Sequence, residues 1–203
     1  MSRYTGPRLK VMRALGLDLP GLSRKTIAER SNPPGQHGAK PKRKSSFALQ
    51  LMEKQKLRMN YGLSERQMRR VVREARSAKG SAGEKIAEFL ERRLDNVVFR
   101  AGFAPTIPAA RQLVNHGHLQ VNGRRVDIAS YRLRVGDIVT LRPKSATLDC
   151  VKETLAEPAL TRPEWLHWDE QNRGAKIAHL PAGDDIPFPV SLQLVVEYYS
   201  QRL

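Results

Sequence analysis

The sequence predicts an α+β fold, in which a series of helices is preceded by an extended basic segment and followed by a compact α/β module. Apolar residues recur at helical spacing between residues 47 and 98. Apolar and polar residues alternate on both sides of an Asn-Gly pair at 122–123, a pattern typical of a β-hairpin. Residues 1–45 show no sustained periodicity and are rich in Gly, Pro, Lys and Arg.

Residues 1–45 are predicted to form a basic N-terminal extension without a core of its own. They hold 11 Lys and Arg against two Asp and Glu. A turn cluster at 31–38 (SNPPGQHG) is followed by the cationic stretch 39–44 (AKPKRK). Such a composition buries too little apolar surface to fold by itself. A disordered tail is one interpretation, and we favour an extension that becomes ordered on a polyanion.

Two helices are predicted after this extension. The first spans residues 47–60. The second begins with a capping box formed by Ser64 and Gln67, and Gly80 is expected at its C-terminal cap. One face of the second helix gathers the apolar residues, which are Met68, Val71, Val72, Ala75 and Ala78. The opposite face carries five arginines, which are Arg66, Arg69, Arg70, Arg73 and Arg76.

We call these five residues the arginine stripe. An exposed helix face usually mixes positive and negative side chains, whereas only Glu65 and Glu74 dilute the arginines of this helix. A guanidinium group binds phosphate oxygens two at a time, which an ammonium group cannot do. The stripe therefore favours contact with a nucleic-acid backbone over an ordinary solvated face.

A third helix is predicted to open at Ser81, which forms a second capping box with Glu84, and to end at Gly102. Its apolar residues follow helical spacing and are predicted to lie in the core, namely Ile86, Phe89, Leu90, Leu94, Val97 and Val98.

The α/β module begins with a helix that Thr106 caps and Gly117 ends. A hairpin at 119–126 and a strand at 135–141 follow. Basic side chains are expected on the helix, beside the hairpin tip and along one face of an extended segment. They are Arg111, Arg124, Arg125, Arg132 and Arg134. Together they predict a basic concave surface that suits the shallow minor groove and backbone of folded RNA.

The overall charge indicates a polyanionic partner. The 203 residues include 36 Lys and Arg against 20 Asp and Glu, a formal net charge of +16. The surplus lies in the first three quarters, because residues 146–203 hold five basic and nine acidic side chains. No apolar run is long enough to span a bilayer, and the first ten residues lack a stretch of signal-peptide type. We therefore expect a cytoplasmic nucleic-acid-binding protein.

No metal site or cofactor is predicted. The single cysteine, Cys150, can form neither an internal disulfide nor a cysteine zinc cluster, and we interpret it as packing or chance. His116 and His118 flank Gly117 without a carboxylate or cysteine at ligand spacing.

Several motifs resemble known families. Residues 93–100 (RLDNVVFR), 110–117 (ARQLVNHG) and 121–123 (VNG) resemble the S-four RNA-binding domain, which also occurs in pseudouridine synthases, tyrosyl-tRNA synthetases and heat-shock RNA binders. Four flanking motifs are similar to the S-four family of bacterial small-subunit ribosomal proteins: 34–38 (PGQHG), 51–58 (LMEKQKLR), 128–131 (IASY) and 194–200 (LVVEYYS). The resemblance spans nearly the whole chain.

This resemblance implies a helical domain made from residues 46–91 and completed by 186–203, with the RNA-binding module, 92–185, inserted between them. The last part of that module is expected to be less regular. It also implies a structural constituent of the small ribosomal subunit that binds the five-prime domain of its RNA at a multi-helix junction and nucleates assembly. Such a protein lies where messenger RNA enters the subunit, beside the small-subunit proteins numbered five and three, and affects decoding accuracy.

The residues predicted to bind ribosomal RNA lie on the basic segments described above, and all but one of them are cationic or imidazole side chains. They are Arg3, Arg8, Lys10, Arg13, Gln36, His37, Lys40, Lys42, Arg43, Lys44, Lys54, Lys56, Arg58, Arg66, Arg69, Arg70, Arg73, Arg76, Arg111, Arg124, Arg125, Arg132 and Arg134.

Two other functions are considered. An RNA-modifying or RNA-charging enzyme would need a catalytic domain, but Asp95, Asp127 and Asp137 occupy helix or turn positions with simple structural roles. Aminoacylation would also need a Gly-rich strand–loop–helix for ATP, which the sequence lacks. A free RNA chaperone fits the module but not its flanks. We therefore predict that the chain is not an enzyme.

Overall fold

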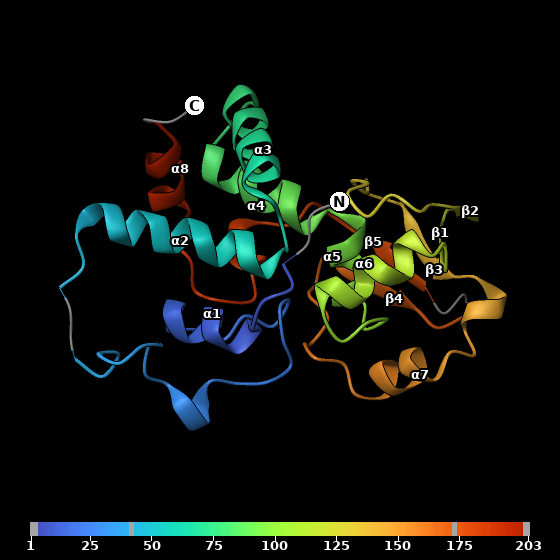
Figure 1. Ribbon diagram of the computed structural model, residues 1–203. Helices are drawn as coiled ribbons and strands as arrows, with labels where there is room; N and C mark the ends of the chain where they lie inside the picture. Colours follow the sequence, from blue (N-terminus) through green and yellow to red (C-terminus); the bar gives the residue numbers. More distant parts are fainter. Residues whose placement is uncertain (1–3, 41–42, 172–173, 201–203) are drawn as a thin grey trace. The chain divides into compact units, whose positions relative to one another are not determined.

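The computed structural model describes residues 4–40, 43–171 and 174–200 (Figure 1). The chain divides into two compact units. The first, the helical unit, comprises Met1–Ala87 and Ile186–Leu203, and the second, the sheet unit, comprises Glu88–Asp185. Helices together with an antiparallel sheet confirm the predicted α+β class.

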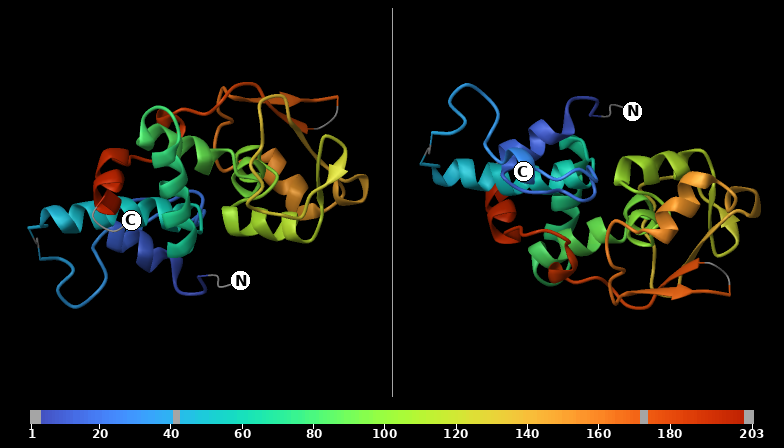
Figure 2. Two further views of the ribbon diagram at one scale, coloured as in Figure 1. Left: turned by 90° about the horizontal axis from the view of Figure 1, so that it is seen from above. Right: turned by 90° about the horizontal axis from the view of Figure 1, so that it is seen from below.

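The helical unit contains α1 (Arg8–Leu15), a 3-10 turn η1 (Ala28–Arg30), α2 (Ser46–Asn60), α3 (Glu65–Ser77), most of α4 (Ala82–Glu91) and α8 (Leu192–Ser200). Helix α8 packs against α2 and α3, so residues 192–200 lie beside residues far earlier in the sequence (Figure 2). The core of the helical unit includes Leu57, Met68, Val72 and Val195, all fully buried.

The capping box predicted at Ser64 and Gln67 is confirmed, with both reciprocal hydrogen bonds present. The predicted C-terminal cap is wrong, because α3 ends at Ser77 with Ala78 at its cap. Gly80 lies two residues further on, at φ +103°. Here glycine shapes the connection to α4 and does not end the helix itself.

The predicted N-terminal segment is not extended throughout, because its first half contains a helix that packs on the rest of the helical unit. Residues Arg8–Leu15 form helix α1, which Gly16 ends in the left-handed conformation at φ +68°. Met12 and Leu19 are fully buried. Helix α1 packs against α2, and the Gly21 amide donates to Oδ1 of the buried Asn60 at 2.9 Å. The sparse apolar residues of this segment bury themselves against the helices that follow.

The sheet unit contains the end of α4, then α5 (Leu94–Arg100), α6 (Ile107–Asn115), β1 (Leu119–Val121), β2 (Arg124–Arg125), β3 (Ile138–Leu141), η2 (Pro143–Ser145), α7 (Asp149–Ala156), β4 (Leu166–Asp169), β5 (Gly174–Ile177) and η3 (Gly183–Asp185). The five strands pair antiparallel in the order β2-β1-β3-β5-β4. Helices α5 and α6 pack together and lie across one face of this sheet (Figure 1).

The single helix predicted from Ser81 to Gly102 is in fact two helices, α4 and α5, separated at Arg92 and Arg93. The reason is a competing set of backbone hydrogen bonds. The Leu133 amide donates to the Arg92 carbonyl at 2.9 Å, and the Leu94 amide donates to the Tyr131 carbonyl at 2.8 Å. Pairing with residues 129–133 therefore replaces the helical bonds at this point.

The predicted hairpin at 119–126 is confirmed as β1 and β2, with Asn122 at φ 50° and Gly123 at φ 76°. Strand β3 confirms the predicted strand at 135–141. The β4–β5 hairpin, which adds two strands to the sheet, was not predicted. Trp165 is fully buried. No helix in the described ranges is both long and apolar enough to cross a bilayer.

Candidate nucleic-acid interface

Helix α3 presents the arginine stripe to solvent. Its apolar face is buried in the helical unit, and all five arginines on the opposite face are exposed. Nε of Arg70 contacts the Glu74 carboxylate at 3.0 Å, although the Arg70 side chain remains 81% exposed. An ion pair this exposed contributes little to stability. The five arginines of the stripe therefore form an exposed cationic surface on the helical unit.

Several predicted residues of the first 44 are also accessible. Arg8, Lys10, Gln36, His37, Lys40, Arg43 and Lys44 are exposed. Arg8 and Arg13 each donate one hydrogen bond to a backbone carbonyl, Arg8 to Leu22 at 3.2 Å and Arg13 to Asn32 at 2.9 Å. The predicted residues Arg3 and Lys42 lie outside the described residues.

The three predicted residues of helix α2 are engaged inside the helical unit. Lys54 is 3% exposed, and its Nζ donates to Glu65 at 2.8 Å while lying 5.0 Å from the centre of the Tyr198 ring. Lys56 donates to Glu53 at 2.6 Å, and Arg58 donates to Gln55 at 2.7 Å. Lys54 therefore joins α2 to α3 and α8, whereas the hydrogen bonds of Lys56 and Arg58 to Glu53 and Gln55 lie within α2.

Glu65 is the acceptor at the centre of this network. The Tyr199 hydroxyl donates to it at 2.7 Å, beside the hydrogen bond from Lys54. Burial raises the pKa of Glu65, but the hydrogen bonds from Lys54 and Tyr199 outweigh burial and hold that pKa below its ordinary value. Burial, and then the hydrogen bond to Glu65, raise the pKa of the Tyr199 hydroxyl. The carboxylate thus joins α2, α3 and α8.

In the sheet unit, Arg111 serves the interior more than the surface. Its Nε and Nη2 donate to Asp95 at 3.0 and 2.7 Å, and Arg93 binds the same carboxylate through two nitrogens at 3.0 and 2.8 Å. The Asp95 side chain is 1% exposed and the Arg111 side chain 24%. The predicted exposed position of Arg111 is therefore only partly met.

Three of the other four predicted arginines of this unit, Arg124, Arg125 and Arg134, are exposed. Arg125 lies over Gly117, because a Cβ added to that glycine would come within 2.4 Å of Arg125 Nε. Arg132 is partly covered, with its guanidinium carbon 4.4 Å from the centre of the Phe89 ring. The hairpin tip and its neighbouring turn therefore carry exposed positive charge.

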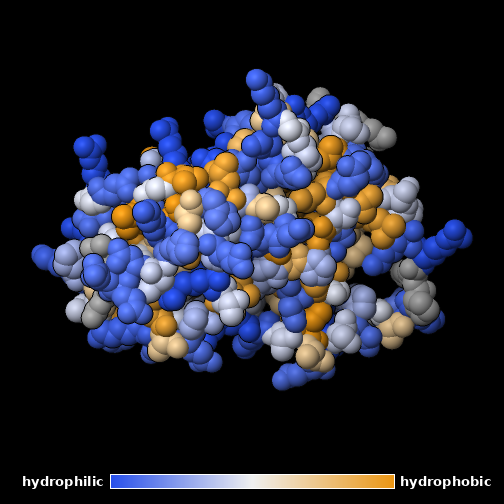
Figure 3. All heavy atoms as spheres, turned by 180° about the vertical axis from the view of Figure 1, so that it is seen from behind, coloured by the Kyte–Doolittle hydropathy of each residue, from blue (hydrophilic) through white to orange (hydrophobic). Residues whose placement is uncertain are grey.

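Some exposed cations were not among the predicted residues. Arg24, Lys25, Lys79 and Lys144 are exposed. They lie in loops or short turns, Arg24 and Lys25 next to each other, where no periodic pattern marks them. Net charge alone pointed to such residues, without identifying them. Hydrophilic residues cover much of the face seen in Figure 3.

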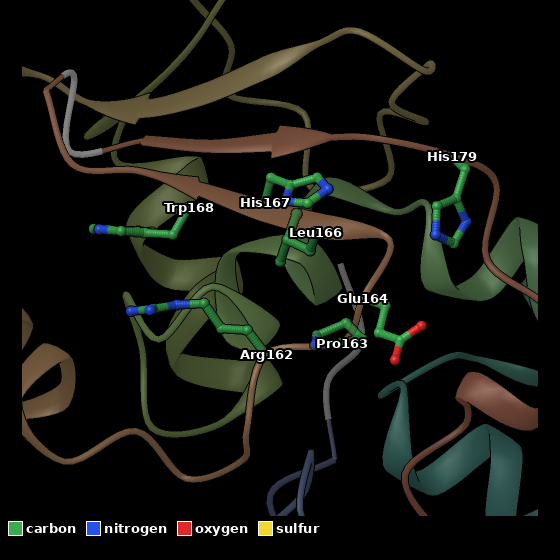
Figure 4. A pocket seen from close by; sticks show the side chains of 7 residues that line it. All are labelled: Arg162, Pro163, Glu164, Leu166, His167, Trp168 and His179. Carbon is green, nitrogen blue, oxygen red and sulfur yellow. The ribbon is translucent and has the colours of Figure 1, made fainter.

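One shallow hollow of about 600 Å³ lies in the sheet unit, lined by Arg162, Pro163, Glu164, Leu166, His167, Trp168 and His179. The Arg162 guanidinium carbon stacks 4.2 Å from the centre of the Trp168 ring. Figure 4 shows the two histidines well apart from each other, with Trp168 on the opposite side of the hollow from His179. The lining holds no serine, threonine or cysteine nucleophile.

Within the described ranges, no group of three potential metal ligands comes together. Cys150 is exposed, so it does not pack in the core.

The sequence was also compared with known families and proteins. Residues 3–91 match the family model described as Ribosomal protein S4/S9 N-terminal domain, and residues 92–139 match the model described as S4 domain. The Small ribosomal subunit protein uS4 of Methylobacillus flagellatus is 65% identical over 205 residues, and uS4B of Nitrosomonas europaea is 61% identical over 205 residues. The uS4 protein of a Synechococcus strain is 53% identical over 204 residues. Each alignment covers 100% of both chains. The chain therefore belongs to the uS4 family of small ribosomal subunit proteins.

Proposed function

We propose that this chain is a structural constituent of the small ribosomal subunit and a primary binder of the five-prime domain of small-subunit ribosomal RNA. Binding there would nucleate assembly of the subunit. The observation that carries the proposal is the arginine stripe, in which five exposed guanidinium groups share one face of α3. Folded RNA offers a dense, fixed array of phosphates that such a row can neutralise.

The electrostatics of the whole chain supports the same partner. A net charge of +16 on 203 residues opposes compaction through self-repulsion. A polyanion removes that repulsion and releases counterions as it binds, so binding is driven strongly at low salt.

The exposed cations define the proposed interface more narrowly than the sequence does. We retain the arginine stripe, the exposed basic residues of the first 44, and the exposed arginines Arg124, Arg125 and Arg134. Lys54, Lys56 and Arg58 are assigned to the interior contacts of the helical unit. Arg111 is assigned chiefly to its ion pair with Asp95.

The proposal extends to neighbours in the particle. It places the protein in the cytoplasm, beside the small-subunit proteins numbered five and three and near the region where messenger RNA enters, with an influence on translational accuracy. It requires no catalytic step and no cofactor. These parts are supported by membership of the uS4 family, and relatives with that printed name align over the full chain.

The salt dependence of RNA binding tests the proposal. With about six to ten phosphate contacts, binding to small-subunit ribosomal RNA should weaken by roughly a thousandfold or more between about 50 and 200 mM salt. Replacing Arg66, Arg70 and Arg73 together with Gln should make the logarithmic salt slope shallower by about two to three units, since each lost phosphate contact removes about 0.9.

A matched control replaces the same three arginines with Lys. This variant keeps the charge and loses the bidentate fork, so its slope should stay close to that of the wild type while its affinity falls. An unchanged slope in the Gln variant would remove the stripe from the interface. A wild-type protein that ignores ribosomal RNA at low salt would contradict the proposed function itself.

A further inference from the structure

The turn at residues 128–131 of the sheet unit exposes two large apolar side chains beside basic ones. Ile128 is 58% exposed and Tyr131 is 38% exposed, while Ala129 between them is buried. Among the described residues, no aromatic ring or guanidinium group stacks on the Tyr131 ring. Burial in the core of the unit therefore does not account for these two side chains.

The backbone beneath them is held firmly. The Tyr131 amide donates to the Ile128 carbonyl at 3.0 Å, which closes the turn. The carbonyls of Tyr131 and Ala129 accept the Leu94 and Asp95 amides at 2.8 and 3.1 Å. These amides open α5, and the Asp95 side chain is itself fixed by two arginines. The turn thus presents the ring on a preorganised support, which lowers the entropy cost of binding.

The surrounding charge is positive. Residues 122–137 contain four arginines, of which Arg124, Arg125 and Arg134 are exposed. Each of the two acidic residues of this stretch already contacts a group within it. Asp137 accepts the Arg134 amide at 2.7 Å and the Asn122 side-chain amide at 2.8 Å, and Asp127 lies 3.7 Å from Arg125. An exposed aromatic side chain in a stretch of the chain that also exposes three arginines complements a partner that is both flat and anionic.

We propose that the Tyr131 ring, with Ile128 beside it, is a stacking platform for an unpaired base of ribosomal RNA, whose flanking phosphates the neighbouring arginines contact. A base within a duplex already has stacking neighbours on both faces. An unpaired base lacks them, so it gains a stacking contact when it binds the tyrosine ring. Stacking on an aromatic side chain accepts any base, because every base has a π-face. This inference rests on the proposed function, and it assigns to Tyr131 a contribution to ribosomal RNA binding that does not depend on charge.

The test compares Tyr131→Leu and Tyr131→Phe in binding to small-subunit ribosomal RNA across a salt series. Leu keeps apolar volume but has no π-face, so affinity should fall roughly 5- to 100-fold at every salt concentration, with the slope unchanged. Phe keeps the ring and should bind within about twofold of the wild type. Leu180→Ala is the matched control, because Leu180 is 44% exposed in the same unit but outside this basic stretch.

Each outcome bears on the platform separately from the proposed function. Wild-type affinity in Tyr131→Leu, with the steep slope retained, would overturn the platform and leave the proposed function standing. Normal RNA binding combined with poor incorporation into particles containing all the proteins would assign the turn to a protein neighbour and equally overturn the inference. A fall in affinity accompanied by an earlier urea midpoint in tryptophan fluorescence would also count against it, because the exposed ring should not support the fold.

Discussion

Replacing Asp95 with Asn should destabilise the sheet unit severely. The Asp95 carboxylate accepts two hydrogen bonds from Arg93, two from Arg111 and one from the Asn96 amide, all between 2.7 and 3.0 Å. The Asp95 side chain is 1% exposed and that of Arg93 is 8% exposed. Asn is similar in volume but removes the charge and turns two N–H donors toward guanidinium groups. Breaking a buried ion pair in this way costs about 3–5 kcal/mol.

Tryptophan fluorescence measures this effect, because both tryptophans of the chain, Trp165 and Trp168, lie in the sheet unit. The expected loss lowers the melting temperature of a unit of this size by roughly 15–30 °C. Asp127→Asn is the matched control, since its side chain is 57% exposed and 3.7 Å from Arg125, and should cost less than about 0.5 kcal/mol. Equal effects of the two substitutions would refute the assignment of Asp95 as the buried acceptor.

Two further predictions concern stability. Because the folded-state pKa of Glu65 is depressed, its contribution is present above about 4.5, its ordinary pKa, and is lost as pH falls through the lower folded value. Glu65→Gln should therefore lower the free energy of unfolding near neutral pH by about 1–2 kcal/mol, a modest figure because the Glu65 side chain is 43% exposed. The substitution should also weaken the acid dependence of that free energy, measured by urea unfolding followed by circular dichroism. An acid dependence identical to that of the wild type would contradict this prediction. Gly117→Ala should destabilise the sheet unit by about 1–3 kcal/mol, because Gly117 has φ +73° and the added Cβ meets Arg125. A tryptophan-monitored urea midpoint equal to that of the wild type would contradict it.

The sequence predicted those features that local chemistry decides. The capping box at Ser64 needs only the residues within one helical turn, and the hairpin at Asn122 and Gly123 needs two positive φ angles. The arginine stripe follows from helical periodicity alone, and the structure exposes each of its members.

Features decided by distant parts of the chain were not predictable in the same way. The break between α4 and α5 depends on hydrogen bonds to residues 129–133, some forty positions later. Met12 and Leu19 are fully buried, although the pattern of residues 1–45 alone does not mark them as core residues. The β4–β5 hairpin has no Asn-Gly turn to mark it.

The candidate interface was overestimated for a related reason. Lys54 and Arg111 are residue types that usually lie on the surface. Only the fold brings Lys54 to Glu65 and Arg111 to Asp95. A sequence pattern places a side chain on a face, whereas the identity of its partner depends on tertiary packing.

Sedimentation of the tagged chain with small ribosomal subunits tests the central claim most directly. We predict that the protein migrates with the small-subunit particle at near-physiological salt and is released as the salt concentration is raised, because phosphate contacts hold it there. A protein that stays at the top of the gradient even at low ionic strength would contradict the account.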